Sequence, residues 1–217
     1  VWSESGKEIL AHTVIISTGA DAKWLGFPSE ERLTNRGVSA CAVCDGFFFR
    51  GQEVAVVGGG DSAAEEAIYL SKLCPKVHLI VRKDYLRASK IMAQRVMDNP
   101  KIEVHFNTET IDVIGEEEVT GALFRNNQTH EEFEVPVKGF FVAIGHKPNT
   151  DIFKDYIELK EGGYIKTITG SAATNVEGVY AAGDVQDNVY RQAITSAGTG
   201  CMAALEAEKY LVNKGIE

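Results

Sequence analysis

Short apolar runs separated by glycine-rich breaks organise the middle of the chain. Residues 53–57 (Glu-Val-Ala-Val-Val) and 77–81 (Val-His-Leu-Ile-Val) predict two buried β-strands. Between them, residues 58–63 (Gly-Gly-Gly-Asp-Ser-Ala) lead into residues 64–72, whose strong helix formers predict a helix. Strand, glycine turn, helix and strand within about 30 residues form a βαβ unit. The pattern therefore predicts an α/β protein with a doubly wound, Rossmann-like parallel sheet.

The same periodicities predict further elements around this unit. A helix is expected at residues 89–98, and a loop that contains a short helix is expected at residues 20–36. Turns at 115–116 and 126–127 predict an antiparallel hairpin or meander. The expected strands and hairpins are residues 1–8 (hairpin), 9–16, 103–107, 110–135 (meander) and 139–144.

Two breaks interrupt the chain in similar ways. Ser-Thr-Gly-Ala at residues 17–20 and Gly-His-Lys-Pro at residues 145–148 each follow a predicted buried strand. We therefore predict that residues 20–145 form an inserted domain, and that residues 1–19 and 146–217 belong together in a second domain.

Composition and charge narrow the classes of function. The chain has 217 residues, 44% of them hydrophobic, and a net charge of −9, which argues against nucleic acid as a partner. No apolar run approaches the roughly 20 residues needed to cross a bilayer, and no secretory signal opens the chain. We expect a cytoplasmic protein with no membrane partner.

The glycine turn fits the dinucleotide-binding fingerprint as Gly58-x-Gly60-x-x-Ala63. Gly58 would permit the tight turn, Gly60 would let the backbone approach the pyrophosphate, and Ala63 would let helix and strand pack closely. Asp61 and Ser62 complete the turn at the helix amino terminus, where backbone amides favour phosphate. The alternative is a turn with a structural role only.

The residues after the second strand distinguish NADP from NAD. An NAD site usually has an acidic residue there, whereas this chain has Arg82, Lys83 and Arg87. Arg82 lies 24 positions beyond Gly58, and the cluster could bind a 2′-phosphate. The alternative is a solvated basic loop.

A Cys-x-x-Cys pair precedes the βαβ unit. Cys41 and Cys44 have a spacing that permits an intrachain disulfide. Asp45 could exchange protons with such a dithiol, although Asp-Gly is also a common turn pair.

Metal binding is not expected from these cysteines. No second Cys-x-x-Cys exists, and the histidines at positions 12, 78, 105, 130 and 146 show no metal-ligand spacing. Cys74 and Cys201 have apolar neighbours in the sequence, so we predict that both are buried, unreactive thiols.

Taken together, these motifs resemble the low-molecular-weight thioredoxin reductases. The resemblance rests on residues 40–46 (Ala-Cys-Ala-Val-Cys-Asp-Gly), the glycine fingerprint and the basic cluster, and it continues to the carboxyl-terminal third. There, residues 179–185 resemble the family's flavin motif and residues 190–200 the segment that meets the isoalloxazine ring. The similarity covers essentially the whole chain.

The resemblance implies an NADPH-dependent flavoprotein and assigns roles to residues. Electrons would pass from NADPH through FAD to the Cys41–Cys44 disulfide and then to thioredoxin, in a homodimer. Cys44 would be the flavin-side thiol, Cys41 would attack the partner, and Asp45 would be the acid/base. The FAD-binding residues would be Gly183, Asp184, Arg191, Gln192 and Ala193.

The chain also departs from the family. Complete members begin with a strand and a glycine fingerprint for the ADP part of FAD, and none precedes Val1, so we expect a partial FAD domain. Three alternatives stay open: the flavoprotein component of an alkyl hydroperoxide reductase, a ferredoxin-linked flavin reductase, and a noncatalytic NADP-binding or dimerisation fragment.

Overall fold

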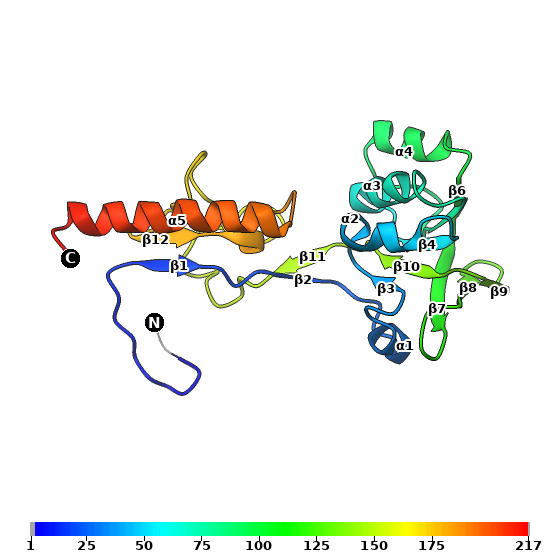
Figure 1. The fold of residues 1–217 in the computed structure, drawn as a ribbon, viewed down its shortest axis with the longest axis horizontal. Helices are drawn as coiled ribbons and strands as arrows, with labels where there is room; N and C mark the ends of the chain where they lie inside the picture. Colours follow the sequence, from blue (N-terminus) through cyan, green and yellow to red (C-terminus); the bar gives the residue numbers. More distant parts are fainter. Residues whose placement is uncertain (1–2, 217) are drawn as a thin grey trace. The chain divides into compact units, whose positions relative to one another are not determined.

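The computed structural model describes residues 3–216 and divides into two compact units. One unit comprises Val1–Asp21 with His146–Glu217, and the other comprises Ala22–Gly145. Figure 1 shows the elements of each unit. Each unit has its own hydrophobic core.

The Ala22–Gly145 unit is built on a five-stranded parallel sheet. The strand order is β3-β10-β4-β5-β6, and every pairing is parallel. Each residue of β4, β5 and β10 is buried, as expected for a parallel sheet covered on both faces. The α/β fold class is confirmed. The strands are β3 (Val38–Ser39), β4 (Val54–Val57), β5 (Val77–Ile80), β6 (Ile102–His105) and β10 (Gly139–Val142).

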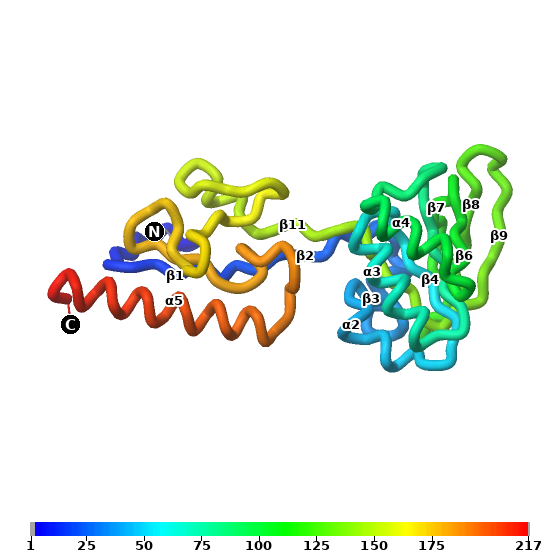
Figure 2. Tube along the Cα trace, turned by 90° about the horizontal axis from the view of Figure 1, so that it is seen from above, coloured from blue at the N-terminus to red at the C-terminus, as the bar shows by residue number. Residues whose placement is uncertain are grey.

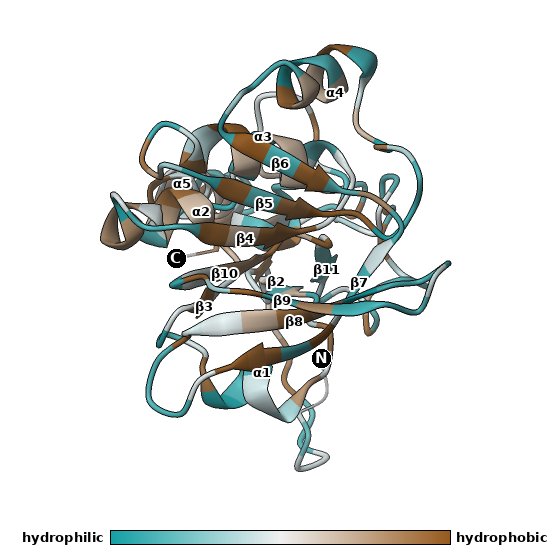
Figure 3. Ribbon diagram, turned by 90° about the vertical axis from the view of Figure 1, so that its right-hand side faces the viewer, coloured by the Kyte–Doolittle hydropathy of each residue, from teal (hydrophilic) through white to brown (hydrophobic). Residues whose placement is uncertain are grey.

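Different layers cover the two faces of this sheet. On one face, α3 (Asp61–Leu70) and α4 (Lys90–Met97) enclose a core that includes Val56 and Leu79. On the other face lies the antiparallel meander, whose Phe124 packs in a second core. Figure 3 shows apolar colour along β4 and β5 and an alternation along β6. The meander comprises β7 (Thr108–Ile114), β8 (Gly121–Asn126) and β9 (Glu132–Val135).

The predicted βαβ unit is confirmed as β4-α3-β5, and the meander is confirmed with three strands. One boundary differs, because α3 begins at Asp61 rather than at residue 64. Gly60 has extended backbone angles, so the helix begins directly after the glycine turn. The elements before β4 are short: α1 (Pro28–Arg32), α2 (Ala42–Asp45) and the 3₁₀-helix η1 (Gly46–Phe49).

The other unit packs one long helix on a two-stranded sheet. β1 (Val14–Ile16) pairs in parallel with β12 (Val179–Ala181), and the 3₁₀-helix η2 (Gly183–Val185) follows β12. Helix α5 (Ala193–Asn213) covers this pair, with Ala203 and Ala207 buried against β12. Figure 2 shows α5 running along β1.

Two short strands carry the chain out of this unit and back. β2 (Ala20–Ala22) pairs with β11 (His146–Pro148), and each lies at a break that the sequence marks with glycine. The Lys23 N–H donates to the Gly145 carbonyl at 3.0 Å. The two crossings are therefore hydrogen-bonded to each other.

The predicted buried strand at residues 9–16 is wrong for its first half. Only Val14–Ile16 form β1, whereas Ile9 is 47% and Leu10 is 87% exposed. Pairing with β12 starts only at Val14, five positions after Ile9. Within the hairpin predicted at residues 1–8, residues 1 and 2 lie outside the described residues, and the Ser3 N–H donates to the Lys7 carbonyl. Among residues 3–216, no helix is long and apolar enough to cross a membrane.

Candidate functional site: a nucleotide pocket and a redox disulfide in one unit

The glycine turn between β4 and α3 requires glycine at one position for internal packing. Gly58 has a φ of +148°, and a Cβ there would lie 2.4 Å from the Ala143 carbonyl oxygen and 2.8 Å from the Ala63 Cβ. Ala63 is fully buried. Gly58 therefore lets the start of α3 pack closely against β4 and the end of β10.

Gly60 differs, because a Cβ there would meet no atom of the described chain within 4 Å. Its backbone angles, φ −96° and ψ −175°, suit any residue. Neither packing nor strain within residues 3–216 explains a glycine at this position. The open space leaves room for a ligand to approach the backbone at the start of α3.

The basic loop after β5 is fixed to the glycine turn by backbone hydrogen bonds. The N–H groups of Arg87 and Ala88 both donate to the Gly59 carbonyl, at 2.6 and 3.1 Å. Asp61 adds a further connection, since its Oδ1 accepts the Ser89 N–H at 2.8 Å. The glycine turn and the basic cluster, which are predicted from separate sequence segments, thus form one site.

A cavity of about 390 Å³ opens where these segments meet. Arg82, Lys83 and Arg87 are exposed side chains on its wall, and none of them lies within ion-pair distance of a carboxylate of residues 3–216. Lys83 Nζ donates to the Tyr85 hydroxyl at 3.0 Å. The lining includes Gly58, Gly59, Arg82, Lys83, Tyr85 and Arg87.

Four residues of the predicted NADP site, Gly60 and the three residues that follow it, do not line this cavity. Asp61 contacts Ser89, Ala63 packs against Gly58, and Ser62 lies in the first turn of α3. The side chains of Asp61 and Ala63 thus have structural contacts. This segment can bind an anion through the backbone N–H groups at the amino terminus of α3, a ten-residue helix.

The cysteine pair forms a disulfide, as predicted. Cys41 and Cys44 are joined, with their Cα atoms 5.3 Å apart. Cys41 is the residue before α2, and its Sγ accepts the Cys44 N–H at 3.2 Å. Cys44 is exposed and Cys41 is partly buried. A backbone N–H that points at a sulfur favours the thiolate once the disulfide is reduced.

A buried serine connects Asp45 to the disulfide. The Ser39 hydroxyl donates to Asp45 Oδ2 at 2.6 Å, and Ser39 Oγ accepts the Cys41 N–H at 3.0 Å. Ser39 ends β3 and is 7% exposed. Ser39 could not be identified from the sequence, because a single serine at the end of a two-residue strand carries no motif.

The predicted flavin-binding residues lie together in the other unit. Gly183 and Asp184 begin η2, and Asp184 Oδ1 accepts the Ser196 hydroxyl at 3.1 Å from the first turns of α5. Ala193 is the first residue of α5, and the Gln192 N–H donates to Thr195 Oγ1 at 3.3 Å. Two sequence segments, one after β12 and one at the start of a long helix, therefore meet.

Asp187 holds the loop that carries Arg191. Its carboxylate accepts the N–H groups of Val189, Tyr190 and Arg191 at 2.9, 3.0 and 3.1 Å. Burial acts to raise the pKa of Asp187, but these three donors and the Thr195 hydroxyl outweigh it, so the pKa lies below its ordinary value. Arg191 has a φ of +48°, a conformation that these bonds help to maintain.

Comparison with known proteins identifies the family. The family model for pyridine nucleotide-disulphide oxidoreductases matches residues 2–200. A thioredoxin reductase of Rickettsia conorii is 50% identical over 97% of this chain, which covers 69% of that protein. The solved thioredoxin reductase of Giardia duodenalis superposes with a TM-score of 0.91 at 39% identity, over 97% of this chain and 69% of that one. The chain belongs to the thioredoxin reductase family.

The match covers nearly all of this chain but only part of each of these relatives. NADPH-dependent thioredoxin reductase 3 of Arabidopsis thaliana is 50% identical over 98% of this chain, but the chain spans only 41% of that relative's length.

The two remaining cysteines differ from each other, and one prediction was wrong. Cys74 is buried as expected, and burial raises the pKa of its thiol to about 11 even though Lys101 acts to lower it. Cys201 is exposed rather than buried. It lies on α5, where Ala203 and Ala207 contact the sheet, so apolar neighbours in the sequence did not indicate burial.

Proposed function

We propose that the chain carries the NADPH-binding and disulfide-bearing part of a thioredoxin reductase, which passes electrons from NADPH through FAD to the Cys41–Cys44 disulfide and on to thioredoxin. The observation that carries the proposal is the presence of a glycine-turn pocket with unpaired cations and an exposed Cys-x-x-Cys disulfide in one compact unit. We assign residues 20–145 to this NADPH domain and residues 1–19 and 146–217 to the FAD domain.

The residues of the pocket fit an NADP nucleotide. The space at Gly60 would admit a pyrophosphate to the amino terminus of α3, and Arg82 with Arg87 would bind a 2′-phosphate through charge-assisted hydrogen bonds. Lys83 would add a third cation. An acidic residue at the end of β5 would favour NAD, and Arg82 follows Val81 there instead.

The FAD assignment rests on the segments around η2 and α5. Asp184 would accept hydrogen bonds from a ribitol hydroxyl, and the backbone at Gln192 and Ala193 would offer amides at the start of α5. Gly183, with a φ of +75°, would let the backbone approach the cofactor, and Arg191 would stand beside it. When bound, NADPH and FAD supply the electron pair that the disulfide receives.

The disulfide chemistry follows from the two sulfurs and Asp45. Two electrons and two protons convert the Cys41–Cys44 disulfide to a dithiol. The Cys41 thiolate then attacks a thioredoxin disulfide, which forms a mixed disulfide and releases one thioredoxin thiolate. The Cys44 thiolate attacks the Cys41 sulfur, restores the intrachain disulfide and releases the second thioredoxin thiolate. Asp45, oriented by Ser39, takes and gives the protons.

We further propose that the protein acts as a cytoplasmic homodimer with no nucleic-acid partner. The net charge of −9 supports the last point, because nucleic acids bind surfaces with an excess of Lys and Arg. The dimer rests on the resemblance alone, and sedimentation of the FAD-loaded protein tests it.

The experiment that tests the thiol roles uses an activated partner. A thioredoxin that retains only its attacking cysteine, linked to thionitrobenzoate, is mixed with Cys44→Ser or Cys41→Ser variants in a Cys201→Ser background. We expect the Cys44→Ser chain to displace thionitrobenzoate and form a covalent conjugate through Cys41. A conjugate formed only by the Cys41→Ser chain would reverse the roles, and no conjugate with either variant would contradict the proposal.

A further inference from the structure

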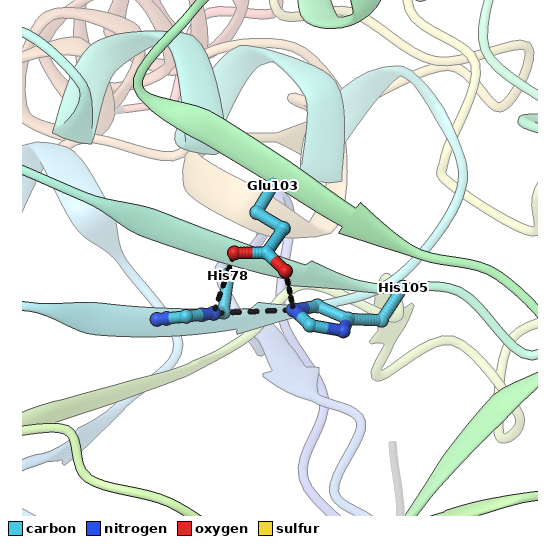
Figure 4. A group of neighbouring side chains, drawn as sticks. All are labelled: His78, Glu103 and His105. Atoms are coloured by element: carbon cyan, nitrogen blue, oxygen red, sulfur yellow. Dashed lines mark hydrogen bonds and ion pairs between the residues drawn. The ribbon is translucent and has the colours of Figure 1, made fainter.

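A cluster of histidine and glutamate side chains lies on the sheet of the Ala22–Gly145 unit, outside the cavity described above. His78 is in β5, and Glu103 and His105 are in β6 (Figure 4). The parallel register pairs His78 with Glu103 and Ile80 with His105, so all three side chains project from the face that carries the meander. Glu103 and His105 come 25 and 27 positions after His78 in the sequence, but they lie beside it on the neighbouring strand.

The candidate ligand atoms lie close to the spacing of a metal site. His78 Nδ1 is 3.1 Å from His105 Nε2, and Glu103 oxygens lie 3.7 Å from His105 Nε2 and 4.0 Å from His78 Nδ1. Tetrahedral zinc with ligand bonds of about 2.0–2.2 Å places its ligand atoms about 3.3–3.6 Å apart. Shifts of a few tenths of an ångström would therefore let the three groups hold one ion.

A second carboxylate orients His78. His78 Nε2 lies 3.1 Å from Glu53 Oε2, so the proton of the neutral ring is on Nε2 and the lone pair of Nδ1 faces His105 and Glu103. Metal-binding histidines commonly donate their second N–H to a carboxylate in this way. The His78 side chain is only 5% exposed, which fixes the ring further. Glu53 immediately precedes β4, so three adjacent strands contribute to the cluster.

His105 is also held in place by its neighbours. Its ring stacks on His78 with centroids 5.4 Å apart, and it packs on Phe133 of β9 at 5.7 Å. Burial lowers the pKa of His105, and His78 and Lys76 lower it further, while Glu103 acts in the opposite direction. Glu103 is about half exposed, which leaves solvent access for an ion and for a water ligand.

One cation competes for the site. Lys76 forms an ion pair with Glu103, and its side chain is 42% exposed. An ion that binds Glu103 must displace this ammonium group into solvent, which a flexible lysine side chain can do. Lys76 should therefore weaken metal binding without preventing it.

We propose that His78, Glu103 and His105 form a binding site for one divalent transition-metal ion of the zinc type, with Glu53 orienting His78 and water completing the coordination. Two imidazoles and a carboxylate are the ligand set that suits such ions. The bound ion joins the edge strand β6 to β5 on the face opposite α3 and α4.

The test measures binding of zinc chloride to the chelator-treated full chain, with its disulfide oxidised and Cys201 replaced by Ser to remove the exposed thiol. We expect one Zn²⁺ per chain, and tetrahedral absorption bands when Co²⁺ replaces Zn²⁺. Glu53→Gln should weaken binding by about 10- to 100-fold. His105→Gln should weaken it at least as much, and Lys76→Gln should tighten it.

His12→Gln provides the matched control, since His12 is exposed and lies in the other unit. It should leave the affinity unchanged. Circular dichroism checks that each variant is folded. If His105→Gln is not folded, the zinc affinities of Glu53→Gln and Lys76→Gln test the proposed site. The proposal would be overturned if the parent chain does not bind Zn²⁺, or if none of the cluster substitutions changes its affinity for Zn²⁺.

Discussion

At the scale of single residues, the two fingerprint glycines have different reasons to be glycine. A Cβ on Gly58 would overlap the Ala143 carbonyl, whereas one on Gly60 would point into open space. We predict that Gly58→Ala lowers the free energy of unfolding by about 1–3 kcal/mol. Gly60→Ala should keep the stability but weaken NADPH binding at least about tenfold, or ~1.4 kcal/mol.

Chemical denaturation and NADPH titration of the two variants test this contrast. Each variant serves as the control for the other, because both add one methyl group to the same turn. Equal loss of stability in both, or unchanged NADPH affinity in Gly60→Ala, would refute the ligand-based reason for Gly60.

The basic cluster gives a second prediction at this scale. Hydrogen bonds to charged groups contribute about 1.5–3 kcal/mol, so the Arg82→Ala, Arg87→Ala double variant should lose at least about tenfold of its preference for NADPH over NADH. Arg95→Ala, on the exposed side of α4, is the control. The ratio of the two dissociation constants is the measurement, and an unchanged ratio would remove the 2′-phosphate assignment.

The residues predictable from the sequence were those that lie close together in the sequence. The cysteine pair and the glycine turn are local motifs whose spacing carries the chemistry. Ser39 lies only two and six positions from Cys41 and Asp45, but a single serine carries no motif. The His78–His105 pair is not local, because strand register brings the two rings together. Residue spacing along the chain therefore does not reveal the histidine cluster.

At the scale of elements, one carboxylate organises the segment that leads into α5. Because the pKa of Asp187 is depressed in the folded protein, its stabilisation is fully present above the ordinary carboxyl pKa and is lost as the pH falls through the folded value. We predict that protection of the Val189–Arg191 amides against hydrogen exchange is constant near neutral pH and falls in acid.

The Asp187→Asn variant separates this carboxylate from general acid effects. It should have low protection of the same amides already at neutral pH, since an amide oxygen replaces the charged acceptor. Asp155→Asn, an exposed aspartate of the same unit, is the control. Equal protection in Asp187→Asn and the parent chain would show that the carboxylate does not hold the loop.

Elements were predictable where local propensity and burial coincide. The β4-α3-β5 unit and the meander carry their turns and apolar periods within short stretches of sequence. The strand predicted at residues 9–16 failed because its burial depends on β12, which lies more than 160 residues away and pairs with only three residues. Apolar character alone did not reveal where that pairing begins.

At the scale of the whole molecule, the chain runs through one unit, enters the second and returns. The two crossings pair as β2 and β11, and Gly19 and Gly145 at these points have φ values of +74° and +104°. We propose that these paired crossings are the hinge about which an NADPH domain and an FAD domain turn, as the family resemblance implies. The breaks in the sequence marked both crossings.

The proposed function requires that the electrons of NADPH reach the Cys41–Cys44 disulfide. To test this, the FAD-loaded protein is treated with NADPH or NADH and quenched with iodoacetamide, and the alkylated cysteines are identified by peptide mass. We expect NADPH to make both Cys41 and Cys44 alkylatable and NADH to do so far more slowly, with Cys201 labelled in every sample. A disulfide that stays intact with NADPH, or that opens equally fast with both nucleotides, would contradict the proposed function.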